Sequence, residues 1–501
     1  MSAAALFWAR FGRAYPDEGF HLACGSLAWD GLVPYRDFLW TQGPLPLYLF
    51  GAAAKLIAPT IWAGRAISAF LAAGAGIAAV ALARRSAGPR AGLVAAALIA
   101  TGAFAMAHLS FTKGYSSAAL LLTLGVLVIA PLFEHGAAES VGRAAAGGAL
   151  LGASALARPT TVVFLVALTV CLAAAGRPKG AAAAGLTAAA TAVAGFAPFL
   201  ILAPAGVRYG LLRFHEAGVL ANPDPWRDAP YRYLPILIVA AAAAAAGPLA
   251  RGLAPFRRHA VSLPLTVSIA ALLIVQTVVG GRRAEYHCLV YPLAAALAAL
   301  WLSPEKTEAE APTKAAGKGR RPASPPPRLV PAAGLAFAVI WGAFFSAPEA
   351  AWLVPGSYYP DPPDTLVTAI RTHSASGDPL LCLRPELALL AGRPLLRGTE
   401  MGTFALFAPR TTPADPGEPP GLVRTPEWLS LIGARQVTLV ALREGDLDNL
   451  NLAAAGTRGA PPFEDALLPA LQRGYRLVLR TTGDEGGRRR HVWELWERLP
   501  R

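Results

Sequence analysis

Apolar residues run in long segments through most of the chain before residue 350, and short polar stretches separate these segments. Several segments are near twenty residues long, which is the length that an α-helix needs to cross a bilayer. The expected spans cover residues 61–83, 91–111, 115–133, 144–156, 160–175, 181–203, 233–250, 261–280, 288–302 and 329–347. The pattern predicts a polytopic α-helical membrane protein with about 10–11 spans.

The composition favours the same class of protein. The 501 residues are 54% hydrophobic and only 15% charged, against roughly 25% charged residues in soluble domains. The net charge of +14 does not indicate nucleic-acid binding, because no basic stripe with interleaved aromatic residues is present. The four cysteines, Cys24, Cys171, Cys288 and Cys382, are widely spaced and show no metal-ligand pattern.

Basic residues gather in alternate loops between the predicted spans, and these loops share one side of the membrane. If residue 17 lies outside the cell, the clusters that begin at Arg84, Arg177, Arg251, Arg257 and Arg320 all lie inside, as the positive-inside bias requires. The membrane bundle is then residues 1–303, and residues 304–328 form a disordered cytoplasmic linker by composition. The predicted location is the inner (plasma) membrane. Residues 1–15 are too short to span it, so either the protein begins outside or a first spanning helix is missing from this start site.

Residues 348–501 have a different pattern, with short apolar runs separated by turns. Helices are expected at 365–373 and 463–472. Strands are expected at 379–383, 437–442, 475–480 and 491–496. This predicts an extracytoplasmic α/β domain, without a glycine-rich phosphate fingerprint.

The most polar stretch of the N-terminal third is residues 15–43, the predicted first outer loop with an interfacial helix. It contains Asp17 and Glu18, and the adjacent pair Arg36 and Asp37. Carboxylates at the edge of a membrane bundle are costly unless they face water or a ligand. The loop is therefore the candidate functional site.

The order of short motifs resembles a known family. The motifs are PDEG, GLVPYRDF and TQGPLPLYL between residues 16 and 49, LARPT at Leu156–Thr160, RRAEYHCLVYP at Arg282–Pro292 and LLAGRPLLRG at Leu389–Gly398. Together they resemble the GT-C glycosyltransferases related to protein O-mannosyltransferases and aminoarabinose transferases. The resemblance implies a GT-C-like helical bundle that takes a sugar from a polyprenyl-phosphate carrier.

The resemblance also implies residue roles. It places the general base at Asp17 and a spanning helix before the first loop. Many relatives have a second acidic residue at the next outer turn, and residues 108–115 of this chain contain none. The ligands of any metal ion are thus unknown, although the Asp17–Glu18 pair is compatible with a bound divalent cation.

The expected chemistry needs one base and fixed cations. An acceptor hydroxyl loses a proton as it attacks the anomeric carbon, and a carboxylate such as Asp17 can accept that proton. Attack from the face opposite the phosphate inverts the anomeric centre. Alternatively, Asp17 caps the helix that begins near residue 19. Glu18 could orient the acceptor, help to bind a cation, or simply occupy the first helical turn.

Several cations lie on the predicted outer side. Arg282, Arg283 and His287 oppose the positive-inside trend, and an arginine fork suits a lipid phosphate. Ordinary anionic headgroups or the C-terminal domain could explain them equally. Lys113 and His108 could line the same pocket, and Arg36 and Asp37 either bind substrate or shape their loop. Arg158, beside Pro159, is as consistent with a structural role as with a functional one.

Two functions are compatible with this pattern. The first is a membrane glycosyltransferase with a polyprenyl-phosphate-sugar donor, a glycan, lipid or protein acceptor and contacts to membrane lipid, but no nucleic acid. The second is a non-enzymatic transporter, flippase or scaffold for cell-envelope glycan assembly. The chain shows no convincing internal repeat of the kind found in many transporters. A receptor whose outer domain binds a ligand is a third, weaker reading, since the spans form most of the chain.

Overall fold

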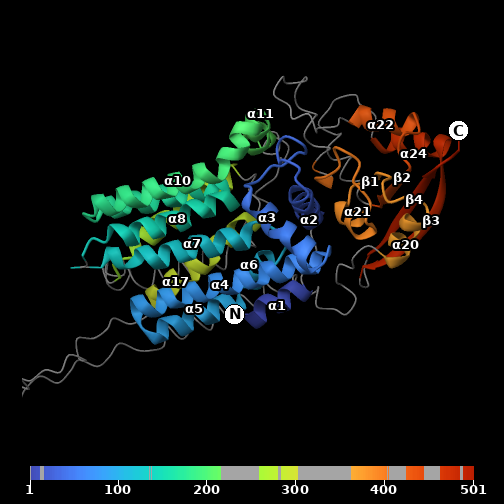
Figure 1. Cartoon of the computed structure of the whole chain (residues 1–501). Coiled ribbons are helices and arrows are strands. Elements are labelled where there is room, and N and C mark those ends of the chain that lie inside the picture. Colours follow the sequence, from blue (N-terminus) through green and yellow to red (C-terminus); the bar gives the residue numbers. More distant parts are fainter. Residues whose placement is uncertain are drawn as a thin grey trace, which may run out of the picture.

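The computed structural model places a helical bundle beside a smaller α/β domain (Figure 1). It describes residues 2–11, 16–134, 136, 138–215, 259–279, 284–302, 363–402, 404, 425–444, 463–485 and 489–500. The predicted span at 233–250, the linker at 304–328 and the last span at 329–347 lie outside the described residues.

The first part of the bundle contains helices on both sides of the predicted outer loop. Their bounds are α1 (Ser2–Phe11), α2 (Pro16–Trp29), α3 (Leu45–Ala52) with a π-helical turn (Ala53–Ile57), α4 (Ile61–Ala87), α5 (Pro89–Thr101), α6 (Ala103–Leu109) and α7 (Tyr115–Ile129) with a 3-10 turn (Ala130–Phe133). Helix α2 is the interfacial helix expected in the first loop. Helix α1 packs on α4 and α6 through Ala5, Trp8 and Ala9, which are buried.

The second part of the bundle continues the antiparallel helices. Its elements are α8 (Val141–Ala157), a 3-10 turn (Pro159–Thr161), α9 (Val162–Ala174), α10 (Pro178–Leu202), α11 (Pro204–Arg208), a π-helical turn (Tyr209–Arg213), α16 (Ser262–Val279), a 3-10 segment (Ala284–Val290) and α17 (Tyr291–Leu302). Four stretches among the described residues are long and apolar enough to cross a membrane: Ile61–Ala87, Tyr115–Phe133, Pro178–Leu202 and Glu285–Leu302. The polytopic helical fold class is therefore confirmed.

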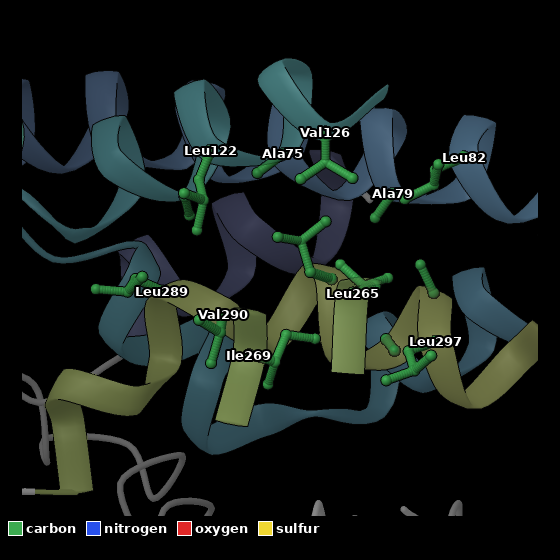
Figure 2. Close-up of a cluster of buried hydrophobic side chains, with 14 of the residues drawn as sticks. Ala75, Ala79, Leu82, Leu122, Val126, Leu265, Ile269, Leu289, Val290 and Leu297 are labelled. Carbon is green, nitrogen blue, oxygen red and sulfur yellow. The ribbon is translucent and has the colours of Figure 1, made fainter. Parts of the chain in front are cut away.

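The core of the bundle is made of small and branched apolar side chains. Figure 2 shows Ala75 and Ala79 of α4 and Val126 of α7 above Leu265 and Ile269 of α16. Small residues let membrane helices approach closely, which strengthens van der Waals packing. Gly148 of α8 is an example, because a β-carbon there would collide with the Ala184 carbonyl oxygen of α10.

The prediction of one continuous span over residues 91–111 is wrong. The helix breaks at Gly102, between α5 and α6. The hydroxyl of Tyr291 on α17 donates to the Leu98 carbonyl oxygen at 2.6 Å, and a β-carbon on Gly102 would collide with the same hydroxyl. The break thus lies against a side chain almost two hundred positions away, and local apolar pattern does not reveal this contact.

The C-terminal domain is a four-stranded sheet with helices on both faces. Its strands are β1 (Leu380–Cys382), β2 (Leu439–Arg443), β3 (Tyr475–Glu485) and β4 (Arg489–Arg498). Their order is β1-β2-β4-β3, with β1 parallel to β2 and the other two pairs antiparallel. Its helices are α20 (Asp364–Thr372), α21 (Pro385–Ala391), α22 (Thr425–Gly433) and α24 (Phe463–Gly474).

Alternation along β2 explains the two layers of helices. Leu439 and Ala441 point to the cluster that contains α20 and α21, whereas Val440 and Leu442 point to the cluster that contains α22 and α24. Successive side chains of a strand point to opposite faces, so a continuous apolar run fits a strand covered on both sides. The expected helices and strands of this domain are all present.

One carboxylate gives the stability of this domain a pH dependence. Burial raises the pKa of Glu400 from 4.5 to about 7, although both carboxylate oxygens accept bonds from the Gly398 amide. A group whose folded pKa is raised stabilises the fold below its unfolded pKa, and this contribution is lost as the pH rises through the folded value. The difference between about 7 and 4.5 corresponds to about 3 kcal/mol.

We therefore expect the thermal midpoint of the full chain to be higher at pH 5 than at pH 8. Replacing Glu400 with glutamine should remove most of this difference, because glutamine does not titrate. Thermal unfolding at the two pH values, for both proteins, is the measurement. An unchanged pH difference in Glu400→Gln would assign the effect to other groups.

Candidate active site

Helix α2 carries two carboxylates of the predicted first loop, those of Asp17 and Glu18, in its first turn. Pro16 is its first residue, and the fixed φ of proline suits the start of a helix. Asp17 and Glu18 follow, where negative charge is favourable next to the unpaired backbone amides. The following residues, Phe20 and His21, are buried. The sequence thus anchors the helix by its apolar side and leaves Asp17 at the edge.

Asp17 forms an ion pair with Lys113. Its Oδ2 lies 2.8 Å from the Lys113 Nζ, and the two side chains are 20% and 4% exposed. Lys113 belongs to the short turn between α6 and α7, almost a hundred residues further along the chain. The structure therefore brings together two predicted site residues, and the Asp17 carboxylate remains partly exposed.

Glu18 is fully buried and faces the other way. Its two oxygens accept bonds from Arg65 Nη2 at 2.6 Å and Arg65 Nε at 2.8 Å, with 0% and 1% of the side chains exposed. Glu18 Oε2 also accepts the Thr112 amide at 3.0 Å. Glu18 thus ties α2 to α4 and to the residue before Lys113. These contacts favour a structural role for Glu18, which fixes the position of α2, over the roles considered from the sequence.

Arg158 lies at the end of α8 as a fixed cation. Its guanidinium carbon is 4.3 Å from the centre of the Tyr115 ring and 4.8 Å from that of the Tyr286 ring. Its Nη1 donates to Gln42 Oε1 at 3.0 Å. No carboxylate pairs with Arg158 among the residues that the structure describes. A guanidinium held by aromatic faces and one amide has donors left for an anion.

His21 completes the cluster as a neutral ring. Its burial lowers its pKa to about 3, with the Asp17 charge opposing this change and Lys113 and Arg158 adding to it. The Gln42 amide nitrogen lies 3.4 Å from His21 Nε2. Because the amide oxygen of Gln42 accepts from Arg158, its nitrogen must be the donor to His21. The proton of the His21 ring is then on Nδ1.

Arg36 and Asp37 shape the first loop. Arg36 Nε and Nη2 donate to the two Asp37 oxygens at 2.8 and 2.9 Å, and Asp37 Oδ2 accepts the Val33 amide at 2.7 Å. The Arg36 hydrogen bond holds the pKa of Asp37 below its usual range. Of the two roles open for this pair, these contacts favour the local one.

The remaining predicted site residues are more scattered. His108 on α6 donates from Nδ1 to the Phe104 carbonyl oxygen at 2.8 Å. His287 is buried in the segment Ala284–Val290, next to the Tyr286 that stacks on Arg158. Arg282 and Arg283 lie outside the described residues. In the part of the chain that the structure describes, no three His, Cys, Asp or Glu side chains cluster as metal ligands.

Sequence reasoning missed Arg65, His21 and Gln42. Arg65 could have been recognised from the sequence, because an arginine inside an apolar span is costly and needs a partner. No sequence pattern indicated His21 or Gln42, because the contact between them depends on how α2 packs against the loop before α3.

An apolar cavity is lined by residues that are close in sequence to Gln42 and Arg158. Its volume is about 530 Å³, and it lies between the first loop, the start of α3 and the last turns of α10. Its lining includes Val33, Leu45, Leu156 and Phe199. Leu156 is two residues from Arg158, and Leu45 is three from Gln42. An apolar chain in the cavity would therefore lie close to the charged cluster.

Comparison with known proteins identifies the fold. No protein-family model and no curated protein sequence matches the chain. ArnT from Cupriavidus metallidurans, solved bound to undecaprenyl phosphate, is similar over 98% of this chain and 96% of its own, with a TM-score of 0.61 and 14% identity. The Archaeoglobus fulgidus oligosaccharyltransferase, in its apo form, is similar over 97% of this chain and 74% of its own, with a TM-score of 0.53 and 13% identity.

A structure of the Archaeoglobus fulgidus oligosaccharyltransferase AglB with an inhibitory peptide and a dolichol-phosphate gives the same TM-score of 0.53, at 13% identity over 95% of this chain and 72% of its own. At these identities the likeness concerns the fold. The chain has the GT-C fold that the motif resemblance implied, with a membrane bundle followed by a C-terminal domain.

Proposed function

We propose that the chain transfers a sugar from a polyprenyl-phosphate-linked donor to an acceptor hydroxyl, with Asp17 as the general base and with inversion at the anomeric carbon. One observation carries the proposal: a partly exposed carboxylate, Asp17, lies in one cluster with two cations, the buried Lys113 and the partly buried Arg158. This is the set of groups that a single displacement at a lipid phosphate needs.

In the reaction, the acceptor oxygen forms a bond to the anomeric carbon while the bond from that carbon to the phosphate oxygen breaks. Asp17 takes the hydroxyl proton. The electron pair of the broken bond stays on the polyprenyl phosphate, whose added negative charge Lys113 and Arg158 stabilise. Fixed charges in a site of low dielectric lower such a barrier because they need no reorganisation.

The donor class has independent support. Undecaprenyl phosphate is bound in the ArnT structure and dolichol-phosphate in the AglB structure. In this chain, the apolar cavity lined by Leu45 and Leu156 is suited to an isoprenoid or acyl chain. The acceptor remains a glycan, a lipid or a protein, and the outward Arg282 and Arg283 remain predicted phosphate ligands.

We also propose that transfer takes place on the extracytoplasmic face of the inner membrane. The distribution of Arg and Lys supports this orientation, because it places the basic clusters on the opposite side from Asp17. The domains then follow the predicted order, with the C-terminal residues 348–501 outside.

The test is sugar transfer from a panel of radiolabelled polyprenyl-phosphate sugars by the purified full chain in lipid. Release from at least one donor is the expected result. No release from any donor by folded protein would contradict the proposal. Movement of carrier lipid across vesicles without sugar release would instead support the transporter or flippase function.

Arg158 gives a sharper prediction. Replacing it with glutamine should raise the KM for the donor by about 10- to 100-fold, since charge-assisted hydrogen bonds contribute about 1.5–3 kcal/mol. Arg85 is a suitable control, because it is an exposed arginine at the far end of α4 from Arg65. An Arg85→Gln protein should keep the wild-type KM. A wild-type donor KM in Arg158→Gln would remove Arg158 from the phosphate site.

A further inference from the structure

Two segments of the C-terminal domain lie directly on α2, the helix that carries Asp17. Helix α21 contacts α2 (Figure 1), and Leu389 of α21 packs against the cluster that includes Leu22. Further along, the Cys24 thiol donates to the Glu400 carbonyl oxygen at 3.4 Å. The Phe20 and Phe404 rings meet edge to face with centres 5.5 Å apart. The contact therefore extends along most of the helix.

The closest approach is between Glu386 of α21 and Gly19. A β-carbon on Gly19 would collide with the Glu386 carboxylate oxygen, and Glu386 is only 1% exposed. Glycine inside a helix costs about 1 kcal/mol relative to alanine, so its presence beside Asp17 and Glu18 needs a reason. The close approach of Glu386 supplies one. A carboxylate is also favourable at the first turn of a helix.

The opposite side of α2 is held by the membrane bundle. Glu18 binds Arg65 of α4 and the Thr112 amide, and Asp17 binds Lys113. Helix α2 is thus enclosed between the bundle and the C-terminal domain. A shift of the domain would move Gly19, and with it the neighbouring Asp17 relative to Lys113.

We propose that the C-terminal domain positions the catalytic helix, with Glu386 as the positioning residue that fixes Asp17 beside Lys113; this inference rests on the proposed function. The domain then acts on catalysis without contacting the reacting atoms. Misplacement of a catalytic group by about 1 Å can cost about 100-fold in rate, so the effect should appear in kcat.

The first test is Gly19→Ala. The added methyl group displaces Glu386 and should lower kcat by about 10- to 100-fold while the donor KM changes little. Gly142→Ala is the matched control, because Gly142 also lies in a helix and a β-carbon there meets no atom within 4 Å. This control should keep the wild-type kcat. A wild-type kcat in Gly19→Ala would overturn the positioning role.

A double-mutant cycle separates the contact from an independent effect on α2. Glu386→Ala should lower kcat by itself. Because both substitutions break the same contact, Gly19→Ala combined with Glu386→Ala should lower kcat no further than the larger single loss. Losses that multiply would show that the two residues act separately and would overturn the proposal.

A readout independent of activity is the labelling of Cys24 by a water-soluble maleimide. Cys24 is fully buried under the domain, and burial raises the pKa of its thiol, which slows labelling further. In a background with alanine at the other three cysteines, Cys24 should be protected in the full chain and should react faster in Gly19→Ala. Fast labelling without the substitution would overturn the proposal.

The two readouts distinguish the ways in which the inference can fail. A protein that protects Cys24 but transfers no sugar from any donor overturns the proposed function, and the positioning role with it. A protein that transfers sugar, and whose Gly19→Ala variant exposes Cys24 without any loss of kcat, overturns the positioning role alone.

Discussion

Replacing Asp17 with asparagine should lower kcat for sugar transfer by about 10²- to 10⁴-fold, the usual loss when a general base is removed. Asparagine has nearly the same shape and cannot accept the proton of the acceptor hydroxyl. It also leaves the Lys113 charge in place, 2.8 Å from the former carboxylate position. The measurement is sugar release under single-turnover conditions with the donor that the wild-type protein accepts.

The Asp17 prediction needs a carboxylate control on the same side of the bundle. Asp30 is suitable, because it is about half exposed and its one ion pair among the described residues is with the exposed Lys55. An Asp30→Asn protein should transfer sugar at the wild-type rate. If Asp17→Asn kept full activity while donor binding remained normal, another group would have to be the base.

The donor should still bind to Asp17→Asn. The phosphate is expected at Lys113 and Arg158, and removing a nearby negative charge favours an anion. Binding of polyprenyl phosphate at wild-type strength or better, together with lost transfer, would separate the chemical step from binding. A loss of both would point to a general disturbance of α2.

The sequence predicted the parts of the fold that depend on local pattern. The spans at 61–83 and 115–133 were recognisable from length and hydropathy, since a bilayer imposes a minimum helix length. The strand at 437–442 was recognisable as a short apolar run beside turns. Local pattern could not show the break at Gly102, where the hydroxyl of Tyr291 from another helix binds the Leu98 carbonyl oxygen.

For the site, the sequence could indicate candidate residues more readily than which of them meet. Asp17 stood out because a carboxylate at a membrane edge is costly. Its partner Lys113 was proposed for the pocket, but their direct ion pair depends on α2 lying beside the turn after α6. Glu18 was expected to orient the acceptor, help to bind a cation or occupy the first helical turn, and only packing shows that it pairs with Arg65.

The buried pair of Glu18 and Arg65 leads to the second large effect. Replacing Arg65 with methionine should lower the free energy of unfolding by about 3–5 kcal/mol, because the Glu18 carboxylate stays buried without its cation. Lys55→Met, which breaks an exposed pair with Asp30, should cost at most about 1 kcal/mol. Thermal unfolding of the three proteins in the same lipid measures the difference.

The double substitution Glu18→Leu with Arg65→Met separates stability from positioning. Replacing a buried ion pair by apolar side chains of similar volume is often neutral for stability, so much of the lost free energy of unfolding should return. Transfer should stay low, because a leucine cannot accept the Thr112 amide, and that bond aligns the neighbouring Lys113 with Asp17. Recovery of both stability and full transfer would mean that the pair only stabilises the fold.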